Sequence, residues 1–156
     1  MTSEFVHLHN HSDYSLLDGA QQVQQLVNTI DDLNMDSLAL TEHGNMFSVV
    51  PFYQKAKKAG INPIIGCETY VAVGSRHDKK LQPGGGWGNN HLILLVQNQI
   101  GYENLMKLVT AGYLEGFYYR PRIDMDLLEK HSEGLVCLSG CLKGEIPEKM
   151  LNGDYN

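Results

Sequence analysis

The sequence predicts an α/β protein built around a parallel sheet, and two features of the chain support this prediction. Apolar strand-like segments and amphipathic helical segments alternate about five times along the 156 residues. The strand segments are apolar at successive positions, which is typical of parallel strands covered by helices on both faces. A barrel and an open doubly wound sheet both fit this alternation. No G-x-G-x-x-G motif follows a strand, so a Rossmann domain has no support.

The composition is that of one globular domain. Hydrophobic residues make up 42% of the chain, which distinguishes it from disordered sequences. Twelve Lys and Arg stand against 18 Asp and Glu, and the resulting net charge of −6 lacks the basic balance of a free-standing duplex binder. The N-terminus has no signal-peptide pattern, and no apolar run approaches the roughly 20 residues that span a bilayer. We therefore expect a cytoplasmic protein with no membrane partner, whose three cysteines are reduced.

The N-terminal segment FVHLHNHSDYSLLD contains the first predicted strand and the first candidate metal ligands. His7, His9 and His11 occupy every second position, so on a strand their imidazoles point to the same side. Neutral imidazoles that converge in this way suit a divalent metal ion. Asp18 follows in a turn closed by Gly19 and can bring a carboxylate to the same place. A chance histidine-rich terminus is the alternative, but a purification tag would be a continuous run of histidines.

The next segments continue the alternation of helix and strand. Residues 20–33 form a predicted helix because their apolar side chains recur at helical spacing. Residues 37–40 form a short buried strand. A second helix is expected over residues 48–60, with Ser48 as its cap. Residues 62–73 contain another apolar strand.

An irregular segment interrupts the pattern before it resumes. Residues 74–90 contain Pro-Gly-Gly-Gly and show no periodicity, so we expect a surface loop inserted into the domain. Asp124 is expected to cap a short helix. The later predicted elements are a strand, a helix, this short helix, a strand and a helix, over residues 91–96, 101–114, 124–130, 135–138 and 144–151.

Candidate ligands lie where the predicted strands end, which is where parallel α/β folds carry their chemistry. Those ends supply His11, His43, Glu68 and Cys141, all of them residue types that ligate metals. His43 could instead be an ordinary turn histidine. Glu68 directly follows a buried strand, where a carboxylate requires a partner. Cys141 could equally be a small core residue.

The remaining histidines and one further cysteine fit this strand-end rule less well. His91 begins its strand, which makes it a weak candidate. His7 lies deeper along the first strand, where packing is as reasonable as ligation. His77 and His131 lie among charged residues and are expected to face solvent, whereas Cys137 lies within a strand and is expected in the core.

Taken in order, several motifs resemble the PHP (polymerase and histidinol phosphatase) domain. They are His-x-His after the first strand, Asp18, Thr-Glu-His-Gly, Gly-Cys-Glu and Ser-Gly-Cys. The resemblance includes the segment HSDYSLLDGA. Two further segments, GYENLMKLVTAGYLEGFYYRPRID and EGLVCLSGCLKGEIP, resemble the branch of this family found at the N-terminus of the alpha subunits of bacterial replicative DNA polymerase III. The resemblance covers essentially the whole chain.

The resemblance implies a distorted seven-stranded (β/α) barrel whose mouth holds up to three divalent metal ions, with Zn favoured and Mn or Fe as alternatives. It adds His91, which the strand-end rule disfavoured, and it gives His7 no ligand role. The usual Asp of the third motif is Glu42 here. Carried over position by position, the implied metal ligands are His9, His11, Asp18, His43, Glu68, His91 and Cys141.

The chain departs from the family pattern at its C-terminal side. The family's final Asp-x-His pair is absent, and about five of the seven βα units are present. Residues 1–156 are therefore expected to be the N-terminal portion of a PHP domain, with residues 74–90 as a loop insertion. The rest of that domain and the polymerase domains, with their palm carboxylates, are not in this chain.

The implied function is metal-dependent phosphoester hydrolysis within a DNA-directed DNA polymerase, a nucleotidyltransferase of DNA replication. Neighbouring metal ions can orient water for attack on phosphorus, and in polymerases this resembles a 3′–5′ proofreading exonuclease. The expected partners are the DNA primer 3′ end and other replicase subunits. The alternative is a structural and docking module that metal ions staple together. A small-molecule phosphatase is disfavoured by the segment YLEGFYYRPRID.

Overall fold

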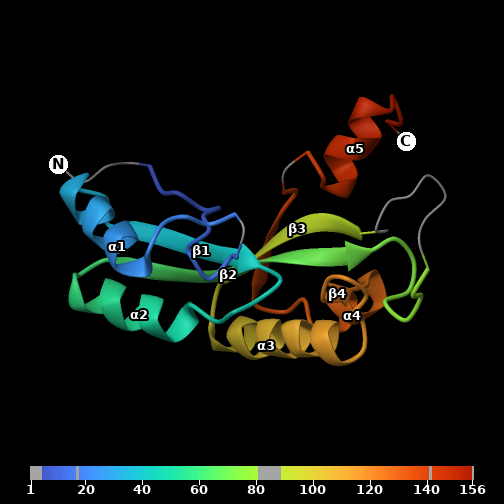
Figure 1. Ribbon diagram of the computed structural model, residues 1–156, viewed down its shortest axis with the longest axis horizontal. Coiled ribbons are helices and arrows are strands. Elements are labelled where there is room, and N and C mark those ends of the chain that lie inside the picture. Colours follow the sequence, from blue (N-terminus) through green and yellow to red (C-terminus); the bar gives the residue numbers. More distant parts are fainter. Residues whose placement is uncertain (1–4, 17, 81–88, 141, 156) are drawn as a thin grey trace.

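The computed structural model describes residues 5–16, 18–80, 89–140 and 142–155 (Figure 1). Its centre is a five-stranded sheet with the path β1-β2-β3-β5, and β4 pairs with β2. The strands are β1 (Ser37–His43), β2 (Asn62–Ala72), β3 (Asn89–Val96), β4 (Arg122–Ile123) and β5 (Leu135–Leu138). The helices are α1 (Val23–Asp32), α2 (Val49–Lys58), α3 (Gln99–Leu114), α4 (Met125–Lys130) and α5 (Glu145–Leu151).

The sheet is mixed, so the prediction of a purely parallel sheet is wrong for β3. Strand β2 is parallel to β1 and β4, whereas β3 is antiparallel to both β2 and β5. A parallel connection needs a crossover, usually a helix. The described part of the connection from β2 to β3, residues 73–80, contains no helix, and the chain returns beside β2 as in a hairpin. The beginning of β3 therefore lies at the edge of the sheet where β1 ends.

The N-terminal segment lies beside β1, but it does not form the predicted strand. Its described residues make one isolated bridge, between His7 and Leu38. The Ala39 N–H donates to the His7 carbonyl at 2.9 Å, and the Thr41 N–H donates to the Asn10 carbonyl at 2.9 Å. Two residues on β1 thus match three on the N-terminal segment, and an extra residue breaks a regular ladder as in a β-bulge. The Asn10 amide fills the gap by donating to the Ala39 carbonyl.

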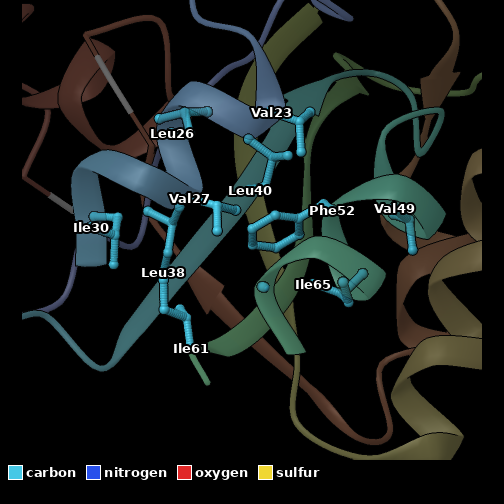
Figure 2. Packing of buried hydrophobic residues seen from close by; sticks show 11 residues of the cluster. Val23, Leu26, Val27, Ile30, Leu38, Leu40, Val49, Phe52, Ile61 and Ile65 are labelled. Atoms are coloured by element: carbon cyan, nitrogen blue, oxygen red, sulfur yellow. The ribbon is translucent and has the colours of Figure 1, made fainter. Parts of the chain in front are cut away.

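Helices α1 and α2 pack on β1 and β2 around an apolar cluster (Figure 2). Four of the five apolar positions predicted for the first helix are buried, with Val27 at 1% exposure, whereas Leu33 lies beyond the end of α1 and is exposed. Phe52 of α2 is completely buried and lies between α1 and the sheet (Figure 2). Ser48 occupies the N-cap position of α2, but its side chain makes no capping hydrogen bond, contrary to expectation. None of the helices in the described ranges is long and apolar enough to cross a membrane.

The second half of the chain matches its predicted elements closely. Helix α4 begins after Asp124, whose carboxylate accepts from the Leu127 N–H at 3.1 Å, which confirms the predicted cap. Strand β4 was not predicted, because two residues carry no periodic signal. Cys137 is exposed, so its expected place in the core is wrong. The reason is that β5 lies at the end of the strand path and pairs only with β3 in the described sheet.

Alternation along the strands separates a helix-covered face from a second face. Leu38 and Leu40 belong to the cluster beneath α1 and α2, while Cys67 and Leu94 belong to the cluster beneath α3. The intervening residues of the strands point to the opposite face, where Ala39, Ile93 and Leu95 form a third buried cluster. This second face continues toward the edge at which β1 ends and β3 begins, and it carries the candidate site.

Candidate metal centre

Glu68 of β2 is a buried carboxylate surrounded by four histidines. The Glu68 side chain is 1% exposed. Its Oε2 atom lies 2.5 Å from His9 Nε2 and 3.2 Å from His11 Nε2. Its Oε1 atom lies 3.3 Å from His43 Nδ1 and also contacts His91 Nδ1. A single carboxylate thus joins the N-terminal segment, β1 and β3.

Strand register explains why these residues meet. His43 is the last residue of β1 and lies directly opposite Glu68. On the other side of β2, His91 pairs with Tyr70, two residues beyond Glu68 on the same face. His91 opens its strand, yet it reaches the site because β3 runs antiparallel to β2. The strand-end rule failed at His91 because it assumed a purely parallel sheet.

Asp18 joins the cluster from the turn that follows the N-terminal segment. Its carboxylate contacts His43 Nε2, so the His43 ring lies between Asp18 and Glu68. The turn closes tightly, since a Cβ atom on Gly19 would lie 1.7 Å from the Ser12 carbonyl oxygen. Glycine is therefore required at position 19, and its absence of a side chain brings Asp18 back toward β1.

The ligand-type atoms form three overlapping groups. Within each group the candidate atoms lie within 4.8 Å of one another. Glu68, His11 and His43 each belong to two groups, as expected of residues between neighbouring ions. The groups are His9 with His11 and Glu68, His11 with Asp18 and His43, and His43 with Glu68 and His91.

Several polar atoms of the cluster lack ordinary partners. His11 Nδ1, His43 Nδ1 and Glu68 Oε1 are buried, and among the residues that the structure describes they find no well-oriented hydrogen bond. Buried polar atoms are nearly always hydrogen-bonded or bound to an ion. Imidazole nitrogens and carboxylate oxygens are also the donors that Zn, Fe and Mn accept. The residues present therefore fit a divalent metal centre.

The electrostatics of the cluster favour charged carboxylates. Burial alone would raise the pKa of Glu68, but its contacts with His11, His43 and His91 hold that pKa far below the usual range. Contact with Glu68 raises the pKa of His43 against the opposing effect of burial, and Asp18 adds to the rise. The contact with His43 lowers the pKa of Asp18. Metal ions would compete with protons for these same histidines.

A second buried carboxylate, Glu42, supports the site from the helix-covered side of β1. The Ser12 N–H donates to both Glu42 oxygens at 3.2 Å, and the hydroxyls of Ser12 and Ser15 donate to them as well. The Ser15 hydroxyl also accepts from the His43 N–H at 3.0 Å. Glu42 thus ties the turn that carries Asp18 to the strand that carries His43. Sequence reasoning noted Glu42 only as a conservative change.

Six of the seven predicted ligands lie together, and their ligation of metal stays a prediction. The seventh, Cys141, lies outside the described residues. His7 is exposed and contacts the ring of Phe5, while His77 is exposed as expected and His131 is half-buried. The six residues are His9, His11, Asp18, His43, Glu68 and His91.

A cavity of about 570 Å³ opens beside the cluster. Asp18, His43 and His91 line it together with Tyr70 and Arg120. Tyr70 and Arg120 were missed by sequence reasoning, because neither belongs to a ligand motif. A second hollow of about 470 Å³, lined by α2 and the opposite ends of β2 and β3, contains none of the candidate ligands. Of these two hollows, only the one beside the cluster is lined by candidate ligands.

The fold and this cluster define an α/β protein with a candidate multinuclear metal centre. Residues 7–156 match the PHP domain family. The chain belongs to this family.

Relatives of the chain include alpha subunits of bacterial DNA polymerase III. The chain is 56% identical over 149 residues to the DNA polymerase III subunit alpha of Borreliella burgdorferi, covering 96% of this chain and 13% of that protein. It is 52% identical to the subunit of Treponema pallidum, with the same coverage, and 48% identical to that of Thermus aquaticus, covering 95% and 12%. A solved amidohydrolase from Chromobacterium violaceum aligns with a TM-score of 0.49 at 24% identity, covering 68% of this chain and 32% of that chain. The chain thus spans about an eighth of the length of these polymerase relatives.

Proposed function

We propose that this chain is the N-terminal portion of the PHP domain of a DNA polymerase III alpha subunit, with residues 74–90 as a loop insertion. The identity to named alpha subunits along almost the whole chain supports this assignment. The whole protein would be a cytoplasmic DNA-directed DNA polymerase that works with DNA and other replicase subunits. The rest of the domain would complete the distorted seven-stranded barrel.

The proposed activity of this module is phosphodiester hydrolysis at a centre of up to three divalent ions. The observation that carries it is the set of three overlapping ligand groups, two of which share the Glu68 carboxylate. Bound ions would supply Lewis acidity and a nucleophile derived from water. The proposed ligands are His9, His11, Asp18, His43, Glu68, His91 and Cys141.

The protein residues would have separable roles in this reaction. The histidines provide neutral nitrogen ligands, which suit Zn and, with carboxylates present, also Mn or Fe. Asp18 and Glu68 provide negative charge that holds several dications close together. Glu42, through Ser12 and Ser15, holds the Asp18 turn against β1. The cavity beside the cluster would receive the substrate.

The substrate we propose is the 3′ end of a DNA primer, which makes the module a 3′–5′ proofreading exonuclease. The open cavity next to the cluster has the size of a small-ligand pocket and can accept a terminal nucleotide. A structural role is the second candidate, and one observation favours it. The ligands come from the N-terminal segment, β1, β2 and β3, so bound metal would also staple these parts together.

The test is a pair of substitutions in the full-length alpha subunit. We expect His11→Ala to lower the metal content and to abolish removal of a 3′-terminal nucleotide, while DNA synthesis continues at other carboxylates. His77→Ala is the matched control, because His77 is exposed and outside the cluster. Retained nuclease activity in His11→Ala would contradict the exonuclease assignment. If the wild type binds metal through His11 but has no nuclease activity, the result supports the structural role and contradicts the exonuclease.

A further inference from the structure

We propose that Arg120 binds a phosphate group of the substrate in the cavity beside the metal centre, with the Tyr70 ring as its platform. This inference rests on the proposed function and adds a protein cation to it. Three features of the molecule support it: the partners of the arginines, the position of Arg120, and the construction of the turn that carries it.

The other two arginines of the chain have structural partners. Arg76 forms ion pairs with Glu115 at 2.6 Å and with Asp124 at 3.0 Å. Arg122 is buried and donates to three backbone carbonyls. Arg120 is exposed, and no carboxylate of the described residues lies within ion-pair distance of it. Its guanidinium is therefore available to a ligand.

Arg120 lines the cavity next to the candidate ligands. Its Cζ atom lies 5.5 Å from the centroid of the Tyr70 ring. The Tyr70 ring in turn lies 5.1 Å from the ring of His91 and 6.4 Å from the ring of His43. All four residues line the same cavity. One aromatic ring thus separates the guanidinium from two proposed metal ligands.

The turn that carries Arg120 is held firmly in this position. Tyr119 adopts a left-handed conformation with φ 59°, and the Tyr118 N–H donates to the Arg120 carbonyl at 3.0 Å. The guanidinium of Arg122 covers the Tyr118 ring at 5.3 Å. A non-glycine residue rarely adopts a positive φ unless its surroundings enforce it. The turn is therefore fixed before any ligand arrives.

A glycine next to the metal centre allows the turn to approach. A Cβ atom on Gly44 would lie 2.8 Å from Pro121 Cγ and 2.9 Å from Tyr70 Cε2. Gly44 also has φ +63°, which favours glycine. Gly44 directly follows His43, so its lack of a side chain couples the arginine turn to the end of β1. Pairing of β4 with β2 reinforces this, because Arg122 lies opposite Tyr70.

The chemistry of the cavity calls for a fixed cation. Asp18 and Glu68 are anionic, and a phosphodiester brings a further negative charge. A guanidinium presents a planar fork of N–H donors that matches two phosphate oxygens. The aromatic ring beneath it limits the motion of the guanidinium and stabilises its charge. Arg120 is thus suited to bind a phosphate while metal ions hold the reacting one.

The test compares three variants of the full-length, metal-loaded alpha subunit: Arg120→Ala, Arg120→Lys and Lys57→Ala. Lys57 is the matched control, because it is an exposed cation 5.9 Å from the Tyr53 ring on α2 and does not line the cavity. We measure metal content, binding of inorganic phosphate by calorimetry, and KM and kcat for a single-stranded oligodeoxynucleotide. Arg120→Ala should weaken phosphate binding and raise KM about tenfold or more, with metal content unchanged.

The two remaining variants sharpen the result. Arg120→Lys should lie between the wild type and Arg120→Ala, because it keeps the charge and loses the fork. Lys57→Ala should match the wild type. Unchanged phosphate binding in Arg120→Ala, a loss of metal in that variant, or a wild type that binds no phosphate would overturn the inference.

The same data separate this inference from the proposed function. If the wild type hydrolyses DNA and Arg120→Ala binds phosphate normally, phosphate binding by Arg120 is refuted, while the proposed nuclease activity is not. If the wild type binds phosphate through Arg120 but does not hydrolyse DNA, the role of Arg120 is supported and the proposed nuclease activity is refuted.

Discussion

The Glu68 carboxylate organises the site at the scale of single residues. It is almost fully buried, and four imidazoles converge on its two oxygens. Burial of a carboxylate is costly unless charged or hydrogen-bonding groups compensate for it. In the metal-free protein the histidines compensate, and in the metal-loaded protein the ions would do so. Glu68 is therefore the residue whose charge matters most.

Replacing Glu68 by Gln should remove this charge while keeping the shape of the side chain. We expect lower metal content, and in the metal-free protein a fall in the pKa of His43, because contact with Glu68 raises it. The raised His43 pKa stabilises the metal-free fold below about pH 6.5, and this stability is lost as pH rises through the folded pKa. NMR titration of His43 measures the change.

The exposed Asp31→Asn is the control for charge alone. It should leave the His43 titration and the metal content at their wild-type values. An unchanged His43 titration in Glu68→Gln would contradict the central place that the structure gives to Glu68.

Ser15 links the buried Glu42 carboxylate to the backbone of His43 through a single hydroxyl. Ser15→Ala removes the donor to Glu42 and the acceptor for the His43 N–H. Leaving buried polar groups without partners costs about 1–3 kcal/mol. We expect a loss of unfolding free energy in that range by urea denaturation. Ser132→Ala, at an exposed position, should change it far less, and equal effects would show that the Ser15 network contributes nothing specific.

Residue types and their spacing are enough to identify most of the candidate site. The histidine and carboxylate motifs of the sequence predict His9, His11, Asp18, His43 and Glu68. Glu42 lies in the Thr-Glu-His-Gly motif, but only the fold shows that it holds the Asp18 turn against β1. Tyr70 and Arg120 belong to no ligand motif, because their importance arises from what the fold places beside them. His91 needed the family resemblance, since its own strand position argued against it.

At the scale of elements, the direction of β3 decides the geometry of the site. The predicted segments were nearly all present, because apolar periodicity reports burial. Periodicity does not report strand direction. The long connection after β2 gave no sign that β3 would run antiparallel beside β2. The bulge near Asn10 was equally invisible, because it depends on how the segment pairs with β1.

Asp124 joins α4 to the loop that follows β2, since it caps α4 and pairs with Arg76. Asp124→Asn should destabilise the fold by about 1–3 kcal/mol near neutral pH, because it loses charge-assisted hydrogen bonds. Burial would raise the pKa of Asp124, but hydrogen bonds from Arg76 and Leu127 lower it overall. Its contribution is therefore present above about pH 3.9 and is lost as pH falls through the folded pKa.

Unfolding free energy measured from pH 7 down to about pH 2, below the unfolded pKa of Asp, tests this. The wild type should lose its advantage over Asp124→Asn as the pH falls. Parallel pH profiles for the two proteins would show that the Asp124 carboxylate adds no stability of its own. Asp126→Asn on the same helix, where the side chain is exposed, is the control.

At the scale of the whole molecule, the two faces of the sheet divide the work. Helices α2 and α3 cover one face (Figure 1), together with α1, whose apolar side chains belong to the same cluster as those of α2. The other face carries the histidines and carboxylates of the candidate site. They come in part from the parallel strands β1 and β2 and from the antiparallel strand β3. The ligands come from four separate segments, so binding of metal and stability of this end of the sheet are coupled.

The central claim is that this cluster is a multinuclear metal centre, and anomalous diffraction from the full-length alpha subunit tests it most directly. Crystals are grown with Zn or Mn, and data are collected on either side of the absorption edge of that metal. We predict at least two neighbouring peaks, each at about 2.0–2.3 Å from nitrogen or oxygen atoms of the cluster, with Glu68 between them. A cluster without anomalous peaks, or peaks only at other places on the protein, would contradict the account.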